Sequence, residues 1–423
     1  MPAHHESDGH SLAPPNRATV QLDALIFGGG AAGLWLLAEL TRRGHSVLLL
    51  EAEALGSGQT VASQGIIHGG LKYTLQGLLT PAARQIRDMP GIWRQCLAGT
   101  GFPNLSQTHV RSHHCHLWRT NTLASHLGMI GAQFGLRIAP QAVVASERPA
   151  ALANCPGTVA RIDEQVLSPA SFIADLAQQY RRRILKVDPE RDIEFQRSGE
   201  HVVRQVALKN GSHQIPLNPR WVVLTAGAGN ARLREQLGLD SERMQRRPLH
   251  MVLARGNLPN LNGHCVDGAT TRATITSDMD SAGRTVWQIG GQISEQGVNQ
   301  SAPVLIAHAR SELRTILPAV DFDGAEWSTY RVDRAEGLTT GGSRPSGVQI
   351  LQDGNVLTAW PTKLALAPQL AADLADRIGL PSDGVFDEGV FKDWACPGVA
   401  IPPWEEAGQE WMQQEATGHP QYG

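Results

Sequence analysis

Apolar runs and glycine-rich breaks alternate at the beginning of the chain. A short apolar run over 24–27 leads into three consecutive glycines, and a helix-like apolar run over 34–40 follows. Arg42 and Arg43 with Gly44 then form a basic last turn and a glycine stop. A second apolar run over 46–50 ends in Glu51. The pattern predicts a strand, a helix and a second strand, which together form a βαβ unit.

The later part of the chain predicts further elements. We expect helices over 80–99, 169–183 and 302–317, and a last helix that ends at Ile378. Pro90-Gly91 is expected to break or kink the first of these, and Ser168 to cap the second. A helix that begins at Asn121 or Thr122 is expected to run to about Gly135. Strands are expected over 193–196, 202–209, 221–224, 250–255, 270–276, 285–290 and 356–359.

The glycines of the first turn have the spacing of a dinucleotide-binding loop. Gly28, Gly30 and Gly33 fall at G-x-G-x-x-G spacing between the first strand and the helix. Gly28 permits the tight turn, Gly30 lets the backbone approach a pyrophosphate, and Gly33 lets helix and strand pack closely. Glu51 ends the second strand, where a carboxylate usually holds a ribose diol. This unit alone predicts a dinucleotide and leaves NAD and FAD both open.

Composition limits the class of protein and its location. The chain has 423 residues, of which 41% are hydrophobic and 18% charged, with a net charge of −3, which is typical of soluble globular proteins of two or more domains. The absence of a basic stripe argues against nucleic acid. Five scattered cysteines favour a reducing, cytoplasmic compartment. No apolar run is long enough to span a membrane, although peripheral contact at an inner membrane face stays open.

The stretch from His109 to Trp118 contains four histidines and a cysteine, a composition that suggests a metal site. Alternation along a strand would place His114 and His116 on one face and His113 and Cys115 on the other. No second cluster at zinc spacing follows. We therefore interpret this stretch as a strand that opens a second domain, and we predict no metal site.

The loop after Glu51 narrows the choice of cofactor. Residues 56–60 read G-S-G-Q-T and residues 66–73 read I-I-H-G-G-L-K-Y. With the glycine turn, these motifs resemble flavoproteins of the D-amino-acid oxidase and glycerol-3-phosphate dehydrogenase superfamily, and the H-G-G-L-K-Y stretch is most similar to the glycerol-3-phosphate dehydrogenase branch. The resemblance implies FAD, with His68 near the reactive ring and Lys72 on the substrate side. The family usually has arginine at the position of Lys72.

Two later stretches extend the resemblance. Residues 222–230 are similar to a family strand whose backbone lies by the FAD diphosphate. Arg344-Pro345 resembles the family's Arg-Pro pair, which makes Arg344 the first candidate for binding a substrate anion, with Arg331 and Arg334 as alternatives. Asp333 and Glu336 are expected to pair with these alternatives. Residues 360–368 resemble the loop that faces the flavin pyrimidine edge, although Trp360-Pro361-Thr362 replaces the branch's glycines.

These motifs imply a complete set of site residues. The expected catalytic residues are His68, Arg344 and Lys72. The expected FAD-binding residues are Gly28, Gly30, Ala31, Ala32, Gly33, Glu51, Ala52, Gly58, Thr60, Ser63, Gln64, Gly65, Ile67, Ala226, Gly227, Thr362, Lys363 and Leu364. Trp287, Trp327 and Tyr330 are either core residues or part of the pocket lining.

The resemblance also implies the architecture. We expect an α/β fold, α+β overall, with a Rossmann-like FAD-binding domain of glutathione-reductase type built from 20–100, 155–240 and 335–395. A mostly antiparallel β substrate domain is expected from 101–154 and 241–334. Residues 1–19 are expected to be a disordered tail and 396–423 a C-terminal tail.

The function expected from this resemblance is that of an FAD-dependent oxidoreductase. It would move a hydride to flavin N5 from a C–H bond next to a hydroxyl or amine of a small anionic substrate, with His68 as a general base or a flavin-orienting residue. Amino-acid oxidase, 2-hydroxy-acid dehydrogenase and glycerol-3-phosphate-like activities all stay open, as does the electron acceptor: a quinone, a carrier protein or oxygen. The alternatives are a non-catalytic, FAD-stabilised binding or assembly protein and, less favoured because of the loop after Glu51, an NAD-dependent dehydrogenase.

Overall fold

The structure is a computed structural model, and it describes residues 19–69, 81–120, 140–199, 201–211, 213–267, 270–345, 347–384 and 386–413. Several sequence expectations lie outside these ranges: Lys72, the tail before residue 19, and the helix expected from Asn121 or Thr122. Among the described residues, no helix combines the length and the apolar character that crossing a membrane requires.

The first sheet is mainly parallel and contains the N-terminal strand at its centre. Its strand order is β17-β18-β11-β1-β2-β8, and the pairs from β18 to β8 are parallel. The strands are β1 (Val20–Phe27), β2 (Val47–Glu51), β8 (Ile184–Lys186), β11 (His213–Leu224), β17 (Gln349–Asp353) and β18 (Val356–Trp360). Strands β9 (Ile193–Arg197) and β10 (Val203–Asn210) extend β11 as an antiparallel ribbon.

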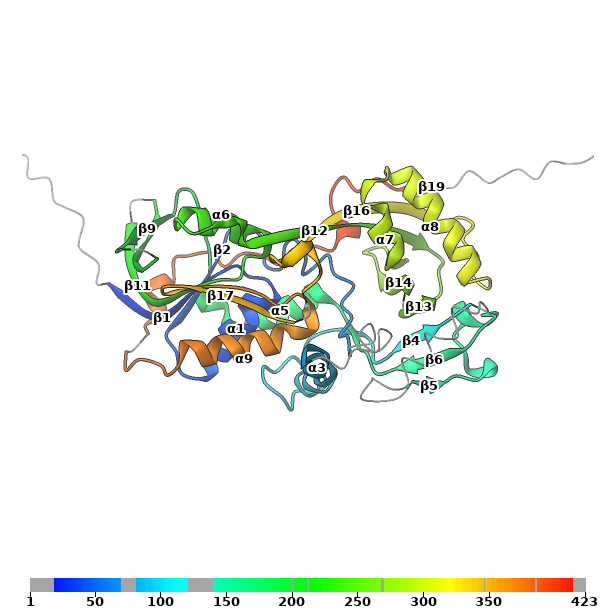
Figure 1. The fold of residues 1–423 in the computed structure, drawn as a ribbon, viewed down its shortest axis with the longest axis horizontal. Coiled ribbons are helices and arrows are strands. Elements are labelled where there is room, and N and C mark those ends of the chain that lie inside the picture. The colour runs from blue at the N-terminus through cyan, green and yellow to red at the C-terminus, as the bar shows by residue number, and fades with distance from the viewer. Residues whose placement is uncertain are drawn as a thin grey trace, which may run out of the picture.

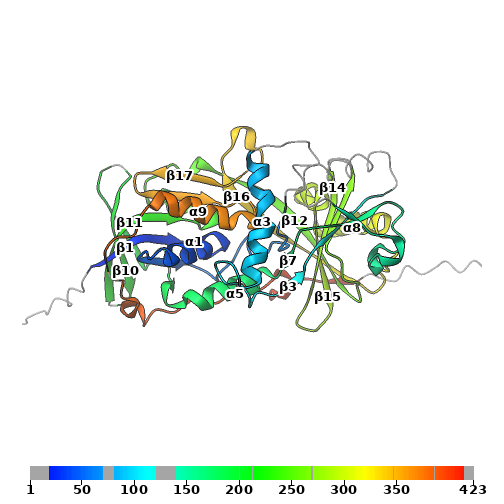
Figure 2. The ribbon, with the colours of Figure 1, turned by 90° about the horizontal axis from the view of Figure 1, so that it is seen from below.

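Helices cover one face of this sheet. They are α1 (Ala31–Arg42), α3 (Pro81–Leu97), α5 (Pro169–Tyr180) and α9 (Ala367–Ile378), and they share one buried apolar cluster with β1 and β2 (Figure 2). The other face packs on the β9–β10 ribbon and on α6 (Asn230–Gln236). As expected, Ser168 caps α5, because its hydroxyl accepts a hydrogen bond from the Ser171 N–H.

The second sheet forms a separate, β-rich half of the molecule (Figure 1). Its order is β19-β16-β12-β15-β14-β13-β4-β6-β5, and each pair is antiparallel except β13 with β4. The strands are β4 (Cys115–Trp118), β5 (Gln141–Ala142), β6 (Val159–Ile162), β12 (Met244–Gly256), β13 (Gly263–Asp267), β14 (Thr270–Met279), β15 (Thr285–Gly290), β16 (Glu326–Gly337) and β19 (Met412–Gln413). Helices α7 (Gln292–Gln296) and α8 (Ala302–Ile316) pack on this sheet. The mixed architecture confirms the expected fold class, while the domain boundaries stay a prediction.

Two local expectations need correction. Helix α3 does not break at Pro90-Gly91 but continues to Leu97, because the proline removes only one intrahelical hydrogen bond. The histidine-rich stretch forms two strands rather than one: β3 (Val110–Ser112) pairs with β7 (Val166–Leu167), whereas β4 joins the large sheet.

The segment after Cys396 packs against the rest of the molecule over its described part. Leu55 N–H donates to the Gly398 carbonyl, and Ala400 N–H donates to the Leu55 carbonyl. Further on, Trp404 is buried against Leu253 and Val286 of the β-rich half, and β19 pairs with β16. This segment therefore contacts both halves of the molecule. Burial of its apolar side chains outweighs the solubility of its acidic ones.

Candidate active site

The turn between β1 and α1 leaves no room for side chains at two of its glycines. A Cβ atom on Gly33 would lie 1.9 Å from the Gly28 carbonyl oxygen, so only glycine allows α1 to approach this turn. Gly28 has a φ of +106°, and a Cβ there would lie 2.5 Å from the Ala226 Cα. Gly30 differs, because a Cβ there would meet only the Thr60 hydroxyl, at 3.2 Å. The turn thus exposes bare backbone and the N-terminus of α1, which suits a pyrophosphate.

Glu51 is held at the end of β2 by the same turn. Its Oε2 accepts a hydrogen bond of 2.6 Å from the Gly29 N–H, and its Oε1 accepts one of 2.8 Å from the Glu53 N–H. Each carboxylate oxygen can accept more than one hydrogen bond. The carboxylate is therefore fixed in orientation and keeps acceptor capacity for a ribose diol.

A cavity of about 490 Å³ extends from this turn. The predicted residues that line it are Gly28, Gly30, Ala31, Ala32, Glu51, Ala52, Gly58, Thr60, Ala226 and Gly227. Tyr330, Arg331 and Trp360 also contribute to the lining. The cavity thus combines a bare-backbone turn, a helix N-terminus and an oriented acid. These features fit the adenosine diphosphate half of a dinucleotide.

A smaller cavity of about 170 Å³ adjoins the first, and Ala62 and Val332 line both. The predicted residues His68, Gln64, Lys363 and Arg344 come together here from distant parts of the chain, with Arg334, Glu295 and His264. The Gln64 amide donates to the carbonyls of Thr274 and Gln288, which ties the predicted cofactor loop to the second sheet.

The remaining predicted cofactor residues lie outside both linings. Gly65 has a φ of +71°, and a Cβ there would lie 2.0 Å from the Leu167 carbonyl oxygen. Ile67 is fully buried, so these two residues anchor the loop against the neighbouring strand. Thr362 adopts a left-handed backbone with φ of +59°, which is rare for a β-branched residue. Ser63 and Leu364 are half-buried near the cavities without lining either.

The smaller cavity is rich in positive charge. Of the described residues, Arg334, Arg344 and Lys363 line it, together with the carboxylate of Glu295, whose Oε1 lies 3.4 Å from Arg334 Nη1. Burial, with repulsion from Arg247 and Arg344, lowers the pKa of Arg334 to about 10, so this guanidinium stays protonated at neutral pH. The lining can therefore bind an anion.

Arg331, Asp333 and Glu336 make structural contacts. Arg331 donates to the carbonyls of Val298 and Gln300, outside the smaller cavity. Asp333 pairs with Arg246, and Glu336 pairs with Arg247. The expected acidic partners therefore do form a network, but with arginines of the neighbouring strand β12.

A buried carboxylate joins two histidines of the smaller cavity. His68 Nδ1 lies 3.3 Å from Glu164 Oε2, and His264 Nε2 lies 3.2 Å from the same oxygen. Oε1 of Glu164 accepts a hydrogen bond of 2.8 Å from the Gly69 N–H. Burial lowers the pKa of His68, with an opposing effect of the Glu164 carboxylate. Sequence reasoning missed Glu164 and His264, because neither lies in a recognisable motif.

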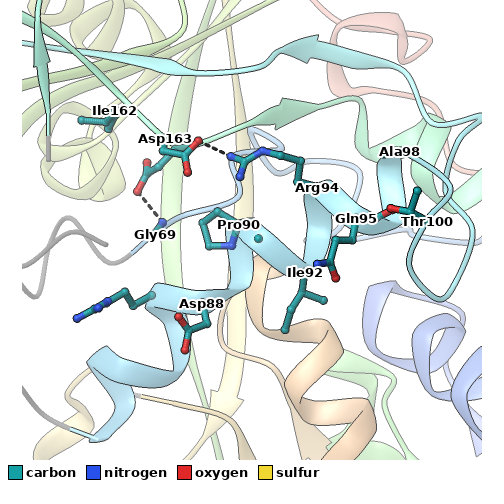
Figure 3. Close-up of a pocket in the computed structure, with 13 residues that line it drawn as sticks. Gly69, Asp88, Pro90, Ile92, Arg94, Gln95, Ala98, Thr100, Ile162 and Asp163 are labelled. Carbon is teal, nitrogen blue, oxygen red and sulfur yellow. Dashed lines mark hydrogen bonds and ion pairs between the residues drawn. The ribbon is translucent and has the colours of Figure 1, made fainter. Parts of the chain in front are cut away.

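Behind Glu164 lies a separate groove of about 500 Å³ (Figure 3). Helix α3 forms one side through Pro90, Ile92 and Arg94, and Asp163 lies opposite, paired with Arg94. Gly69 lies in its wall, and its hydrogen bond to the buried carboxylate is drawn as a dashed line. Among the described residues, no predicted site residue lines this groove.

Within the described ranges, the histidine-rich stretch does not bring three ligand-type side chains together at one metal site. The rings of His114 and His116 lie 5.0 Å apart. Among described residues, the group of ligand-type side chains close enough for one ion is His68, Glu164 and His264.

The three aromatic candidates fall into two groups. Trp287 and Trp327 are fully buried in the core of the β-rich half, whereas Tyr330 lines the larger cavity.

Comparisons with known proteins identify the family of the chain. Residues 23–358 match the family DAO, described as FAD dependent oxidoreductase. The chain is 40% identical over 394 residues to "Probable FAD-dependent oxidoreductase PA4991" of Pseudomonas aeruginosa, covering 91% of this chain and 98% of that one. The crystal structure of that protein is similar with a TM-score of 0.77 and 35% identity, over 92% and 98% of the two chains.

More distant structures share the fold. L-alpha-glycerophosphate oxidase from Mycoplasma pneumoniae with FAD bound is similar with a TM-score of 0.61 and 15% identity, over 87% of this chain and 98% of that one. Glycine oxidase from Geobacillus kaustophilus gives 0.59 and 16%, over 89% and 99%. The chain belongs to the DAO family of FAD-dependent oxidoreductases, and its cofactor is FAD, which the glycine turn and the oriented Glu51 fit.

Proposed function

We propose that this flavoenzyme oxidises a small anionic metabolite at a C–H bond next to a hydroxyl or an amine. The observation that carries the proposal is the charge of the smaller cavity, whose described lining contains the cations Arg334, Arg344 and Lys363 and the carboxylate Glu295. A volume of about 170 Å³ favours a substrate of a few heavy atoms. FAD supplies the acceptor for the hydride, and the protein binds the anion and accepts the proton.

Each predicted catalytic residue that lies in the described ranges has a separate part in this proposal. Arg344 holds the substrate carboxylate or phosphate, because a guanidinium can bind either with two parallel hydrogen bonds. Lys363 adds a point charge from the loop that precedes α9. His68 is the candidate base. The five cysteines are free, which supports a reducing, cytoplasmic location.

The first experiment tests both flavin chemistry and substrate class. The purified holoprotein is mixed anaerobically with glycine, L-proline, 2-hydroxy acids and glycerol phosphate, and the flavin absorbance is followed. We expect one anionic compound to bleach the flavin, while its uncharged analogue does not. Bleaching by neutral alcohols alone would contradict an anion site, and no bleaching by any compound would favour a binding role.

The second experiment tests the anion site. Arg344→Ala should raise KM for the bleaching substrate by at least about tenfold, because the loss of one charge-assisted hydrogen bond costs about 1.5–3 kcal/mol. The FAD content should not change. Arg191→Ala is the matched control, since Arg191 is 79% exposed and pairs with Asp188 on the surface. Loss of FAD in Arg344→Ala would show that Arg344 is structural.

A further inference from the structure

The carboxylate of Glu164 is positioned to decide which nitrogens of two histidines carry hydrogen. Its side chain is 1% exposed, and its Oε2 is shared by His68 Nδ1 and His264 Nε2. Burial alone would raise the pKa of Glu164, but the two histidines hold that pKa well below its usual range. Since an ionised carboxylate can only accept hydrogen bonds, both facing ring nitrogens must be donors.

The two histidines then differ in whether a ring nitrogen remains available to accept a proton. His264 Nδ1 lies 3.0 Å from the Thr274 hydroxyl, so it accepts from that hydroxyl and both of its nitrogens are engaged. His68 has its Nδ1–H directed at Glu164, which leaves Nε2 as an acceptor in the neutral ring. The His68 side chain is 38% exposed and lines the smaller cavity.

We propose that Glu164 is a positioning residue that holds His68 in its Nδ1–H tautomer, so that His68 Nε2 is the base for the substrate proton. His264 in turn holds the carboxylate in place through its second contact. This inference rests on the proposed function for the identity of the proton, but the tautomer itself does not depend on any substrate.

The proton and the electrons leave the substrate separately. The C–H bond breaks, and its hydrogen departs with the electron pair as the hydride that FAD accepts. The O–H or N–H proton passes to His68 Nε2, and a carbonyl or imine forms between carbon and the heteroatom. The balance needs no further oxidant, and His68 ends as an imidazolium.

The charges that face His68 explain why Glu164 is required. His264 and Lys363 oppose a positive charge on His68, and Arg334 and Arg344 line the same cavity. Glu164 is the carboxylate that contacts the ring directly. Without it, an imidazolium would form among cations, and Nδ1–H would have no acceptor. The Glu164 carboxylate stabilises the imidazolium through its charge and its contact with Nδ1.

The test compares Glu164→Gln with Asp163→Asn in the holoprotein. Glutamine keeps the shape of the side chain and can still accept from Gly69, but its NH₂ can turn toward His68 Nδ1. The control Asp163→Asn removes the same charge one residue away. Asp163 pairs with Arg94 at the groove and not with either histidine. Nitrogen-15 NMR of histidine-labelled protein reports the tautomer, with signals assigned by their loss in His68→Asn.

The expected wild-type result is a protonated Nδ1 and an unprotonated Nε2 on His68, unchanged in Asp163→Asn and reversed in Glu164→Gln. With whichever compound bleaches the flavin, the reduction rate should fall about 10²- to 10⁴-fold in Glu164→Gln only, with FAD content kept and the acid limb of the pH profile altered.

Other results would overturn the inference. A wild-type His68 with Nε2 protonated would do so without any variant, even if Glu164→Gln fails to fold. Stoichiometric metal in the holoprotein that disappears in Glu164→Gln but persists in Asp163→Asn would identify the cluster as a metal site instead. If no compound bleaches the flavin, the proposed function fails while the NMR result still decides the tautomer.

Discussion

Gly33→Ala tests the physical account of the cofactor turn. The added Cβ would lie 1.9 Å from the Gly28 carbonyl oxygen and 2.7 Å from the Thr225 hydroxyl, whereas real Cβ contacts begin at about 3.0 Å. The carbonyl belongs to the turn itself, so the backbone rather than a flexible side chain must move. Overpacking of this kind costs about 1–3 kcal/mol.

The expected effect can be stated for two observables. If the cost falls on the FAD-bound form, the affinity for FAD drops between about 5- and 150-fold, because 1.4 kcal/mol corresponds to a factor of ten. Because α1 packs on this turn even without FAD, the thermal midpoint of the apoprotein should fall as well. Fluorescence titration with FAD and thermal unfolding of the apoprotein measure the two effects.

Gly30→Ala is the matched control. Its backbone φ of −81° suits alanine, and its Cβ would meet only the Thr60 hydroxyl, which can move. Gly30 lines the cofactor cavity, however, so the methyl group should weaken FAD binding while leaving the apoprotein midpoint unchanged. The reasoning is refuted if Gly33→Ala leaves both observables at wild-type values, or if both variants lower the apoprotein midpoint equally.

Three further predictions concern stability. Burial lowers the pKa of His116 to about 4, below its unfolded value of 6.5. The unfolded chain therefore binds more protons, and stability should fall as the pH drops from 6.5 toward 4. The melting temperature of His116→Gln should depend less on pH than that of the wild type, and an equal dependence in both proteins would contradict this. Thr362→Gly should not lower the midpoint, because relief of about 1–2 kcal/mol of left-handed strain exceeds the entropy cost of about 0.5–1 kcal/mol; a lower midpoint would show that the threonine side chain holds the turn. Trp93→Phe removes a buried N–H that donates to the Ala365 carbonyl and should cost about 1–3 kcal/mol in thermal unfolding, whereas an unchanged midpoint would refute that contribution.

The cofactor half of the site could be predicted because its determinants are local. The role of Gly28 and Gly33 depends on one turn, and Glu51 ends the strand next to it. A few side-chain identities at fixed spacing therefore specify the geometry. The loop that follows separated FAD from NAD through its resemblance, and the family match confirms FAD.

The substrate half could not be predicted in the same way. Glu164 lies 96 residues from His68 and 100 residues before His264 in the chain, so their meeting depends on the tertiary fold and not on local sequence. Strand alternation separates Arg331 from Arg334, because residues three apart point to opposite faces. The sequence does not say which face lines the cavity. That choice is made by the pairing of β16 with β12.

The position of β1 in the sheet determines how long this strand lacks a partner during synthesis. Its neighbour β2 follows within a few tens of residues, but its other neighbour, β11, pairs Trp221 with Ala24. That partner lies about 200 residues further along, which at 5–20 residues per second is a delay of roughly 10–40 s on the ribosome. Throughout this interval one edge of β1 lacks its native partner. The nascent flavoprotein is therefore expected to depend on chaperones before the first sheet closes, and on FAD only after it.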